Sequence, residues 1–140
     1  MPPTRDRFAA AITCIDGRVQ RPVSDWIRLY VNVHHVDLIT EPGPDKVLSS
    51  GPKHLIEDII RKVSFSVRHH FSPAVAVTGH HDCAANHASK EEHIQQILEG
   101  VRVILAHLPN VRVLGLWVNE WESVELISDT EAREPQRSFL

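Results

Sequence analysis

The chain has 140 residues, a length that fits one domain with a hydrophobic core of its own. Hydrophobic residues make up 42% and charged residues 24% of the sequence, close to the average of globular domains, which argues against wholesale disorder. The net charge is −3 with the histidines neutral, and there is no basic block, so we expect neither nucleic acid nor a membrane surface as a partner.

Cysteine use and the start of the chain set an expectation for the compartment. Cys14 and Cys83 are the only cysteines, which argues against a secreted disulfide scaffold. Residues 1–7 read as a polar, proline-bearing N-terminal extension, and no apolar signal-peptide segment follows them. No apolar run approaches the ~20 residues that a membrane-spanning helix needs. We therefore expect a cytoplasmic, reducing location.

The first third of the chain alternates between short apolar runs and helical periodicity. Residues 8–14 are almost wholly apolar, which is typical of a strand buried on both faces, and the run ends at the turn signal Asp16-Gly17. Residues 22–30 are predicted to form a helix that begins with Pro22 in its first turn. Residues 36–40 read as a second strand, which residues 41–44, Glu-Pro-Gly-Pro, bring to an end.

The remainder continues this alternation. A helix is predicted over 52–70, because apolar residues recur there at spacings of four, three and four: Ile56, Ile60, Val63 and Val67. A third buried strand is expected over 74–78. Ser89 and Glu92 form the pattern of a capping box for a helix that ends before Pro109, and a fourth strand is expected over 111–118.

Strands that alternate with helices predict a parallel sheet whose crossovers cover both of its faces. The predicted fold is therefore α/β, a three-layer open sheet with a parallel core of about four strands flanked by helices. We expect it to form one domain over 8–128. Residues 129–140 are polar and aperiodic, so we expect a flexible C-terminal tail there.

Chemically informative residues follow two of the predicted strands. In open α/β sheets ligands bind beyond the carboxyl ends of the strands, where Cys14 closes the first strand and His80 and Cys83 follow the third. Two thiolates and an imidazole are a common zinc set, and three protein ligands leave a fourth position for water, as in catalytic zinc. A carboxylate such as Asp16 can accept a hydrogen bond from that water or fill the fourth position itself, and Arg18 would keep it ionised and fix its direction.

These residues carry a family resemblance. Residues 14–18, Cys-Ile-Asp-Gly-Arg, resemble the Cys-x-Asp-x-Arg motif of β-class carbonic anhydrases, and residues 79–84, Gly-His-His-Asp-Cys-Ala, resemble that family's Gly-His-x-x-Cys-Gly/Ala motif. The likeness covers roughly 8–127 and is greatest to the small, compact branch of the family. It implies a β-carbonic anhydrase-like fold, a homodimer or higher homo-oligomer, and CO2 or bicarbonate as the small-molecule substrate.

The resemblance also implies residue roles. One Zn²⁺ per chain would be held by Cys14, His80 and Cys83. A zinc-bound hydroxide would hydrate carbon dioxide reversibly to bicarbonate, and Asp16, gripped by Arg18, would orient it. Such a site, with two thiolates cancelling the charge of the ion, should show activity that rises into alkaline pH.

The sequence departs from the family pattern in one place and leaves alternatives open. After its second strand the family commonly has Arg-Asn-Ala-Gly, whereas residues 39–44 read Ile-Thr-Glu-Pro-Gly-Pro, so only the glycine is kept. This bears on substrate and rate more than on metal binding. Three alternatives stand beside the hydration of carbon dioxide. The chain could be a hydrolase of carbonyl sulfide or carbon disulfide on the same site, or a non-catalytic zinc-binding homologue. The third alternative is a thiol-based redox protein that uses Cys14 and Cys83 without zinc.

Some histidines and tryptophans remain without a firm role. His81 and His87 are candidates for a proton relay, with a plain surface histidine as an equally good interpretation. Four other histidines are expected at solvated helix ends and are assigned no role: His34, His35, His69 and His70. Trp117 and Trp121 are expected in the core or at an interface.

Overall fold

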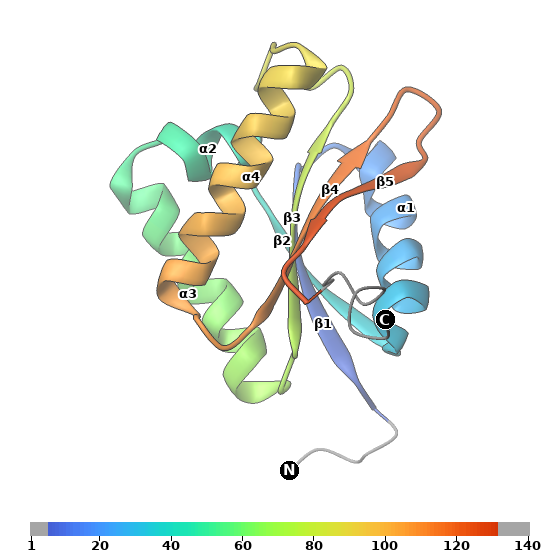
Figure 1. The fold of residues 1–140 in the computed structure, drawn as a ribbon, viewed down its shortest axis with the longest axis vertical. Coiled ribbons are helices and arrows are strands. Elements are labelled where there is room, and N and C mark those ends of the chain that lie inside the picture. The colour runs from blue at the N-terminus through green and yellow to red at the C-terminus, as the bar shows by residue number, and fades with distance from the viewer. Residues whose placement is uncertain (1–5, 132–140) are drawn as a thin grey trace, which may run out of the picture.

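In the computed structural model of the chain, which describes residues 6–131, five strands form one sheet in the order β2-β1-β3-β4-β5 (Figure 1). Four of them are parallel neighbours: β1 (Phe8–Thr13), β2 (His35–Thr40), β3 (Ala74–His80) and β4 (Arg112–Val118). The fifth, β5 (Val124–Asp129), runs antiparallel to β4 at the edge of the sheet. The predicted parallel core of about four strands is confirmed, and β5 is an addition to it.

Helices cover both faces of the sheet, so the fold has the three layers that the sequence predicts. On one face lies α1 (Gly17–Ile27), which continues as the π-helical turn η1 (Arg28–Asn32). On the other face lie α2 (Pro44–Ser50), α3 (Lys53–His69) and α4 (Lys90–His107), as Figure 1 shows.

Successive residues of β1 point to opposite layers, which gives the molecule two hydrophobic cores. Ala9 and Ala11 pack toward α1, whereas Ala10 and Ile12 pack toward the three helices of the other face. All seven residues of β3 are buried, as expected for a strand covered on both sides. The larger core receives side chains from α2, α3 and α4: Leu48, Ile59, Val63, Ile97, Val101 and Ile104.

Two helix starts show how local hydrogen bonds decide an element's boundary. The capping box is present as predicted, since Ser89 and Glu92 each bond the other's backbone N–H at the start of α4. The start predicted at Pro22 is wrong. Helix α1 begins at Gly17, because the Asp16 side chain accepts a hydrogen bond from the Arg18 N–H, and Pro22 lies inside the helix.

Two elements were not predicted from the sequence, one after β2 and one at the edge of the sheet. Helix α2 begins at Pro44, directly after the Glu-Pro-Gly sequence that ends β2. Strand β5 ends at Asp129, and the Thr130 N–H donates to the Val113 carbonyl, so the first two residues of the expected tail are hydrogen-bonded to the sheet. At the N-terminal end of the described chain, the Arg7 carbonyl accepts hydrogen bonds from the backbone N–H groups of His34 and His35. Residues 1–5 and 132–140 of the expected extension and tail lie outside the described residues.

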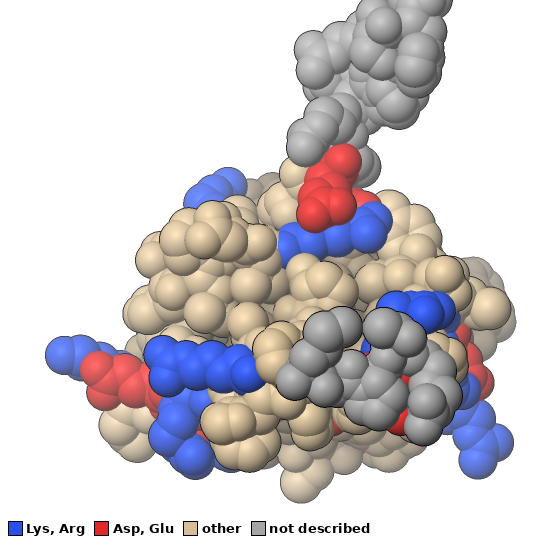
Figure 2. Space-filling model, turned by 90° about the horizontal axis from the view of Figure 1, so that it is seen from below, with Lys and Arg blue, Asp and Glu red and all other residues tan. Residues whose placement is uncertain are grey.

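Charged side chains of both signs are interspersed on the end of the molecule from which β1 and β3 start. Figure 2 shows blue and red side chains there around a broad area of other residues, with no field of a single sign on this face. Within residues 6–131 no helix combines the length and the apolar character that crossing a membrane requires.

Candidate metal centre

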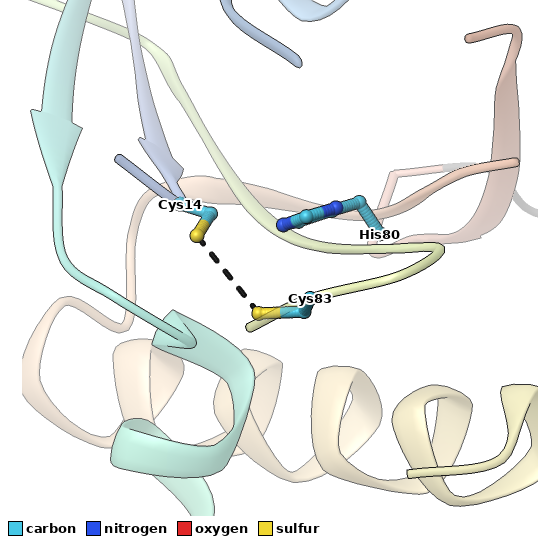
Figure 3. Close-up of side chains that lie close together, drawn as sticks. All are labelled: Cys14, His80 and Cys83. Atoms are coloured by element: carbon cyan, nitrogen blue, oxygen red, sulfur yellow. Dashed lines mark hydrogen bonds between the residues drawn. The ribbon is translucent and has the colours of Figure 1, made fainter. Parts of the chain in front are cut away.

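Three side chains from two distant segments converge beyond the carboxyl ends of β1 and β3 (Figure 3). Cys14 directly follows β1, His80 is the last residue of β3, and Cys83 lies three residues further along. The two sulfurs are 3.9 Å apart although their residues are 69 positions apart in the chain. One ligand atom from each of the three residues lies within 4.8 Å of the other two. The structure therefore brings together the three predicted ligands, because β1 and β3 are adjacent parallel strands.

The hydrogen bonds of His80 leave one ring nitrogen available. Its Nδ1 lies 2.8 Å from the carbonyl oxygen of His81, which can only accept, so Nδ1 carries the proton and donates it. Its Nε2 therefore keeps a lone pair, is buried, and has no hydrogen-bond partner among the described residues. A buried polar atom without a partner is unfavourable, and a cation bound at Nε2 would satisfy it.

The two sulfurs fit the same cation. Both cysteines are free and buried. Burial raises the pKa of the Cys83 thiol, while backbone N–H groups of Ala85 and Asn86 oppose the rise and the nearby Cys14 adds to it. Two thiolates this close need a positive ion between them. Two sulfurs and one imidazole nitrogen are a donor set that suits zinc and leaves one position open.

Asp16 and Arg18 form a two-point ion pair beside this cluster. Arg18 donates from Nε to Oδ1 of Asp16 at 3.0 Å and from Nη2 to Oδ2 at 2.6 Å. These hydrogen bonds, with that of the Arg18 backbone N–H, lower the pKa of Asp16 to about 2. The same pairing raises the pKa of Arg18. The carboxylate is therefore ionised at neutral pH and fixed in direction.

Arg18 also contacts the loop that carries the other two candidate ligands. Its Nη2 donates to the backbone carbonyl of Asp82 at 3.1 Å, and its Nη1 lies 3.4 Å from the carboxylate of Asp82. Asp82 adopts a left-handed backbone conformation, with φ of 58°, between His80 and Cys83. One guanidinium thus links the loop after β1 to the loop after β3.

Gln20 is a residue of the site that the sequence does not reveal. Its Nε2 donates to the Cys14 carbonyl at 2.6 Å and to the Asp16 carbonyl at 3.2 Å, which fixes the backbone between those residues. The available signal is its position one helical turn after Asp16, on the same side of α1. That spacing is too common to single out a functional glutamine.

Two hollows lead to the candidate ligands. A small cavity of about 30 Å³ lies beside His80 and Arg18 and is bounded by the turn between β4 and β5. A more open hollow of about 380 Å³ reaches Cys83 and is flanked by the exposed His81 and His87. Both histidines are thus placed beside the cluster, and their role as proton relays stays a prediction.

The other singled-out aromatic residues lie elsewhere. Trp117 is buried in the larger core as predicted, whereas Trp121 is 76% exposed in the turn before β5 and is not a core residue. His35 and His70 both pack against the ring of Phe8, at the end of the sheet opposite the cluster. Their ring centroids lie 4.9 and 4.2 Å, respectively, from that of Phe8. His70 is not simply solvated, because its Nδ1 hydrogen-bonds Asp37 at 2.6 Å.

Comparisons with known proteins agree with this geometry. A family model described as "Putative carbonic anhydrase" matches residues 4–128. The structure resembles β-carbonic anhydrase isoform I from the protozoan Trichomonas vaginalis, with a TM-score of 0.58 and 16% identity over 89% of this chain and 85% of that one. It also resembles the carbonic anhydrase from Glaciozyma antarctica, with a TM-score of 0.58 and 18% identity over 90% and 85%.

A third similar structure belongs to the tetrameric β-carbonic anhydrases of the ascomycete Sordaria macrospora, with a TM-score of 0.51 and 12% identity over 87% of this chain and 80% of that one. At such identities the shared property is the fold. A search of curated protein sequences found no match.

Proposed function

The chain belongs to the β-carbonic anhydrase family, and from that premise we propose that it is a zinc enzyme that hydrates carbon dioxide reversibly to bicarbonate. The observation that carries the proposal is the buried Nε2 of His80, which has no partner among the described residues and belongs to one cluster with two free thiols. Such a donor set is suited to zinc and unsuited to a bare protein interior.

In this proposal Cys14, His80 and Cys83 hold one zinc ion per chain. When bound, zinc would act as a Lewis acid and lower the pKa of the water it coordinates, which would provide a nucleophile that forms increasingly as the pH rises. The hydrogen bond from His80 Nδ1 to the His81 carbonyl keeps the ring in the tautomer whose Nε2 can bind the ion. Gln20 holds the backbone that carries Cys14.

Asp16 would act as the oriented acceptor of the reaction. Because its pKa is about 2, its carboxylate stays ionised throughout the working pH range and can accept a hydrogen bond from water in the site. Arg18 occupies both carboxylate oxygens from one side, which prevents rotation of the group. The arrangement favours one direction for the water's proton and therefore one direction for its attacking lone pair.

Access to the cluster supports a small substrate from either of two sides. The small cavity beside His80 is bounded by Arg18 and the turn between β4 and β5, and the more open hollow reaches Cys83. A compact linear molecule such as carbon dioxide suits both approaches.

The assembly and the compartment are part of the same proposal. We propose a homodimer or higher homo-oligomer, which is supported by the tetrameric state named for the Sordaria macrospora enzymes and by the position of β2 and β5 at the edges of the described sheet. Light scattering of the purified protein tests it. A cytoplasmic location is supported by two free cysteines, which must stay reduced to bind zinc.

The deciding experiment combines metal analysis with stopped-flow hydration of carbon dioxide. We expect about one zinc per chain in freshly purified protein and a hydration rate well above that of buffer. The variant Cys83→Ser should lose both, since it removes a candidate ligand at little change in size. Protein without zinc, or zinc-loaded protein that does not accelerate hydration, would refute the proposed function.

A further inference from the structure

A buried polar cluster lies behind the loop that carries Cys83. It consists of Asp45 at the start of α2, Asn86 in the loop and His93 in α4, which are 1%, 3% and 2% exposed. None of these residues belongs to the candidate ligand set. Polar side chains buried this completely are retained only where they are hydrogen-bonded, so their partners indicate what the cluster does.

Asp45 is the centre of the cluster. Its Oδ1 accepts hydrogen bonds from the Lys46 backbone N–H and from Nδ2 of Asn86, both at 3.0 Å. Its Oδ2 lies 2.6 Å from Nδ1 of His93. All three partners can serve as N–H donors, so the network is complete only when position 45 provides acceptors on both oxygens.

Asn86 connects this centre to the candidate ligand. The two hydrogens of its Nδ2 are used by Asp45 and by Oε1 of Gln96, the latter at 2.6 Å, which fixes the side chain from both sides. Its backbone N–H donates to the Cys83 carbonyl at 3.3 Å, and the backbone N–H groups of Ala85 and Asn86 act to lower the pKa of the Cys83 thiol. The orientation of the Asn86 side chain thereby sets the conformation of the turn around Cys83.

Close packing at two glycines leaves this arrangement little freedom. A Cβ on Gly79, the residue before His80, would lie 2.4 Å from Oδ2 of Asp45. Gly43 has a φ of 59°, and a Cβ there would lie 3.3 Å from the side chains of Ala85 and Asn86. The start of α2 therefore packs closely against Gly79, which precedes His80, and against residues 85–86, which follow Cys83. Figure 3 shows α2 and α4 on the same side of the two sulfurs.

We propose that Asp45 is a positioning residue of the metal centre, which acts through Asn86 to hold Cys83 in the conformation that faces Cys14 and His80. The proposal rests on the proposed function in one respect, namely that the ion is zinc. It gives a role to the segment around residues 39–45, where the sequence departs from the family pattern.

Zinc affinity and the absorption of the cobalt(II)-substituted protein test the proposal. Asp45→Asn keeps the size of the side chain but replaces one acceptor oxygen by an amide donor, so either Asn86 or His93 loses its acceptor. We expect a 10- to 100-fold loss of zinc affinity in chelator competition, the usual range for a residue that orients a ligand. The sulfur-to-cobalt charge-transfer band should weaken or shift as well.

The matched control is Asp129→Asn, which alters another buried carboxylate in β5, away from the cluster. It should lower the unfolding temperature but leave zinc affinity and the cobalt spectrum unchanged. Asn86→Ala is a second test, because it breaks the link to Cys83 while Asp45 and His93 remain paired. It should show the same loss of affinity, including in the case where Asp45→Asn does not fold.

The outcomes separate this proposal from the proposed function. A folded Asp45→Asn or Asn86→Ala protein with wild-type zinc affinity and an unchanged cobalt spectrum would show a purely structural cluster and would overturn the inference. Wild-type protein that binds zinc with a sulfur-to-cobalt band but does not hydrate carbon dioxide would overturn the proposed function alone.

Discussion

Asp16 combines three tasks in one side chain. It caps α1, it is paired at two points with Arg18, and it stands two residues after a candidate zinc ligand. The cap and the ion pair need only an oxygen acceptor, which asparagine would partly provide. The proposed orientation of water needs a second, negatively charged acceptor, which asparagine lacks. A single isosteric substitution can therefore separate the structural tasks from the catalytic one.

We expect Asp16→Asn to reduce the hydration rate by roughly 100-fold or more, the range of a lost positioned proton acceptor, while the zinc content stays at one per chain. Stopped-flow hydration and metal analysis of the same preparation measure both. Asp25→Asn on the same helix is the control, because Asp25 is exposed and, within residues 6–131, forms an ion pair with Arg28 alone. An Asp16→Asn protein with full activity would contradict the assigned role.

At the residue scale, the sequence indicated the three candidate ligands but not the residues that hold them in place. Cys14, His80 and Cys83 could be found because sulfur and imidazole are distinctive and each follows a predicted strand. Gln20 and Asn86 could not, since amide side chains are common and these act through hydrogen bonds to backbone or to residues that only the fold brings near. Spacing along the chain carries no information about such partners.

At the scale of elements, the sequence did not predict α2 and β5, and the reason differs between them. Helix α2 is only seven residues long and begins at Pro44, directly after Glu-Pro-Gly, so its few apolar positions establish no helical period. Strand β5 is half-buried at the sheet edge, and its sequence Val-Glu-Leu-Ile-Ser-Asp has neither the continuous apolar run of a buried strand nor the strict alternation of a half-buried one. Long periodic elements such as α3 and the capping box of α4 were predictable because their signals are local.

The position of β5 depends on a buried ion pair, which gives it a pH-dependent stability. Asp129 accepts two hydrogen bonds from Arg112 and one from Tyr30, at distances of 2.6 to 3.0 Å. The Arg112 hydrogen bond chiefly lowers the pKa of Asp129 from 3.8 to about 2. Because the pKa in the folded state is depressed, the stabilisation is complete above the unfolded pKa and is lost as pH falls through the folded value.

We expect the free energy of unfolding of Asp129→Asn to be lower than that of the wild type by roughly 2 kcal/mol near neutral pH. The gap should narrow as pH falls from about 4 to about 2, where the wild-type carboxyl is itself protonated. Urea denaturation at several pH values measures it. Asp58→Asn on α3 removes a half-buried carboxylate that pairs with Arg61 and Lys62 at the surface and should change stability little. A gap that stays constant over that interval would exclude Asp129 as its source.

At the scale of the whole molecule, strand order creates the site. Alternating strands and helices predict an α/β sheet, but they do not state which strands are neighbours. The chain returns β3 to the side of β1, and this adjacency brings Cys14 next to His80 and Cys83. The expectation that both motifs meet at one rim followed from the family resemblance and the strand-end rule together, and hydrophobic periodicity alone would not have supplied it.

The same topology predicts how the protein responds to loss of metal. The larger core contains none of the three candidate ligands, and the smaller core contains Cys14 and Cys83 among many apolar side chains, so a strong chelator should leave a folded protein with a cooperative unfolding transition. The proposed zinc site exists only in the folded chain, so free zinc at about 100 times its dissociation constant should stabilise the fold by about 2.7 kcal/mol and raise the unfolding temperature. Calorimetry with and without chelator measures the difference. Cys83→Ser serves as the control, since its unfolding temperature should no longer respond to zinc. An apo chain with no cooperative transition would mean that the ion, and not the two cores, completes the fold.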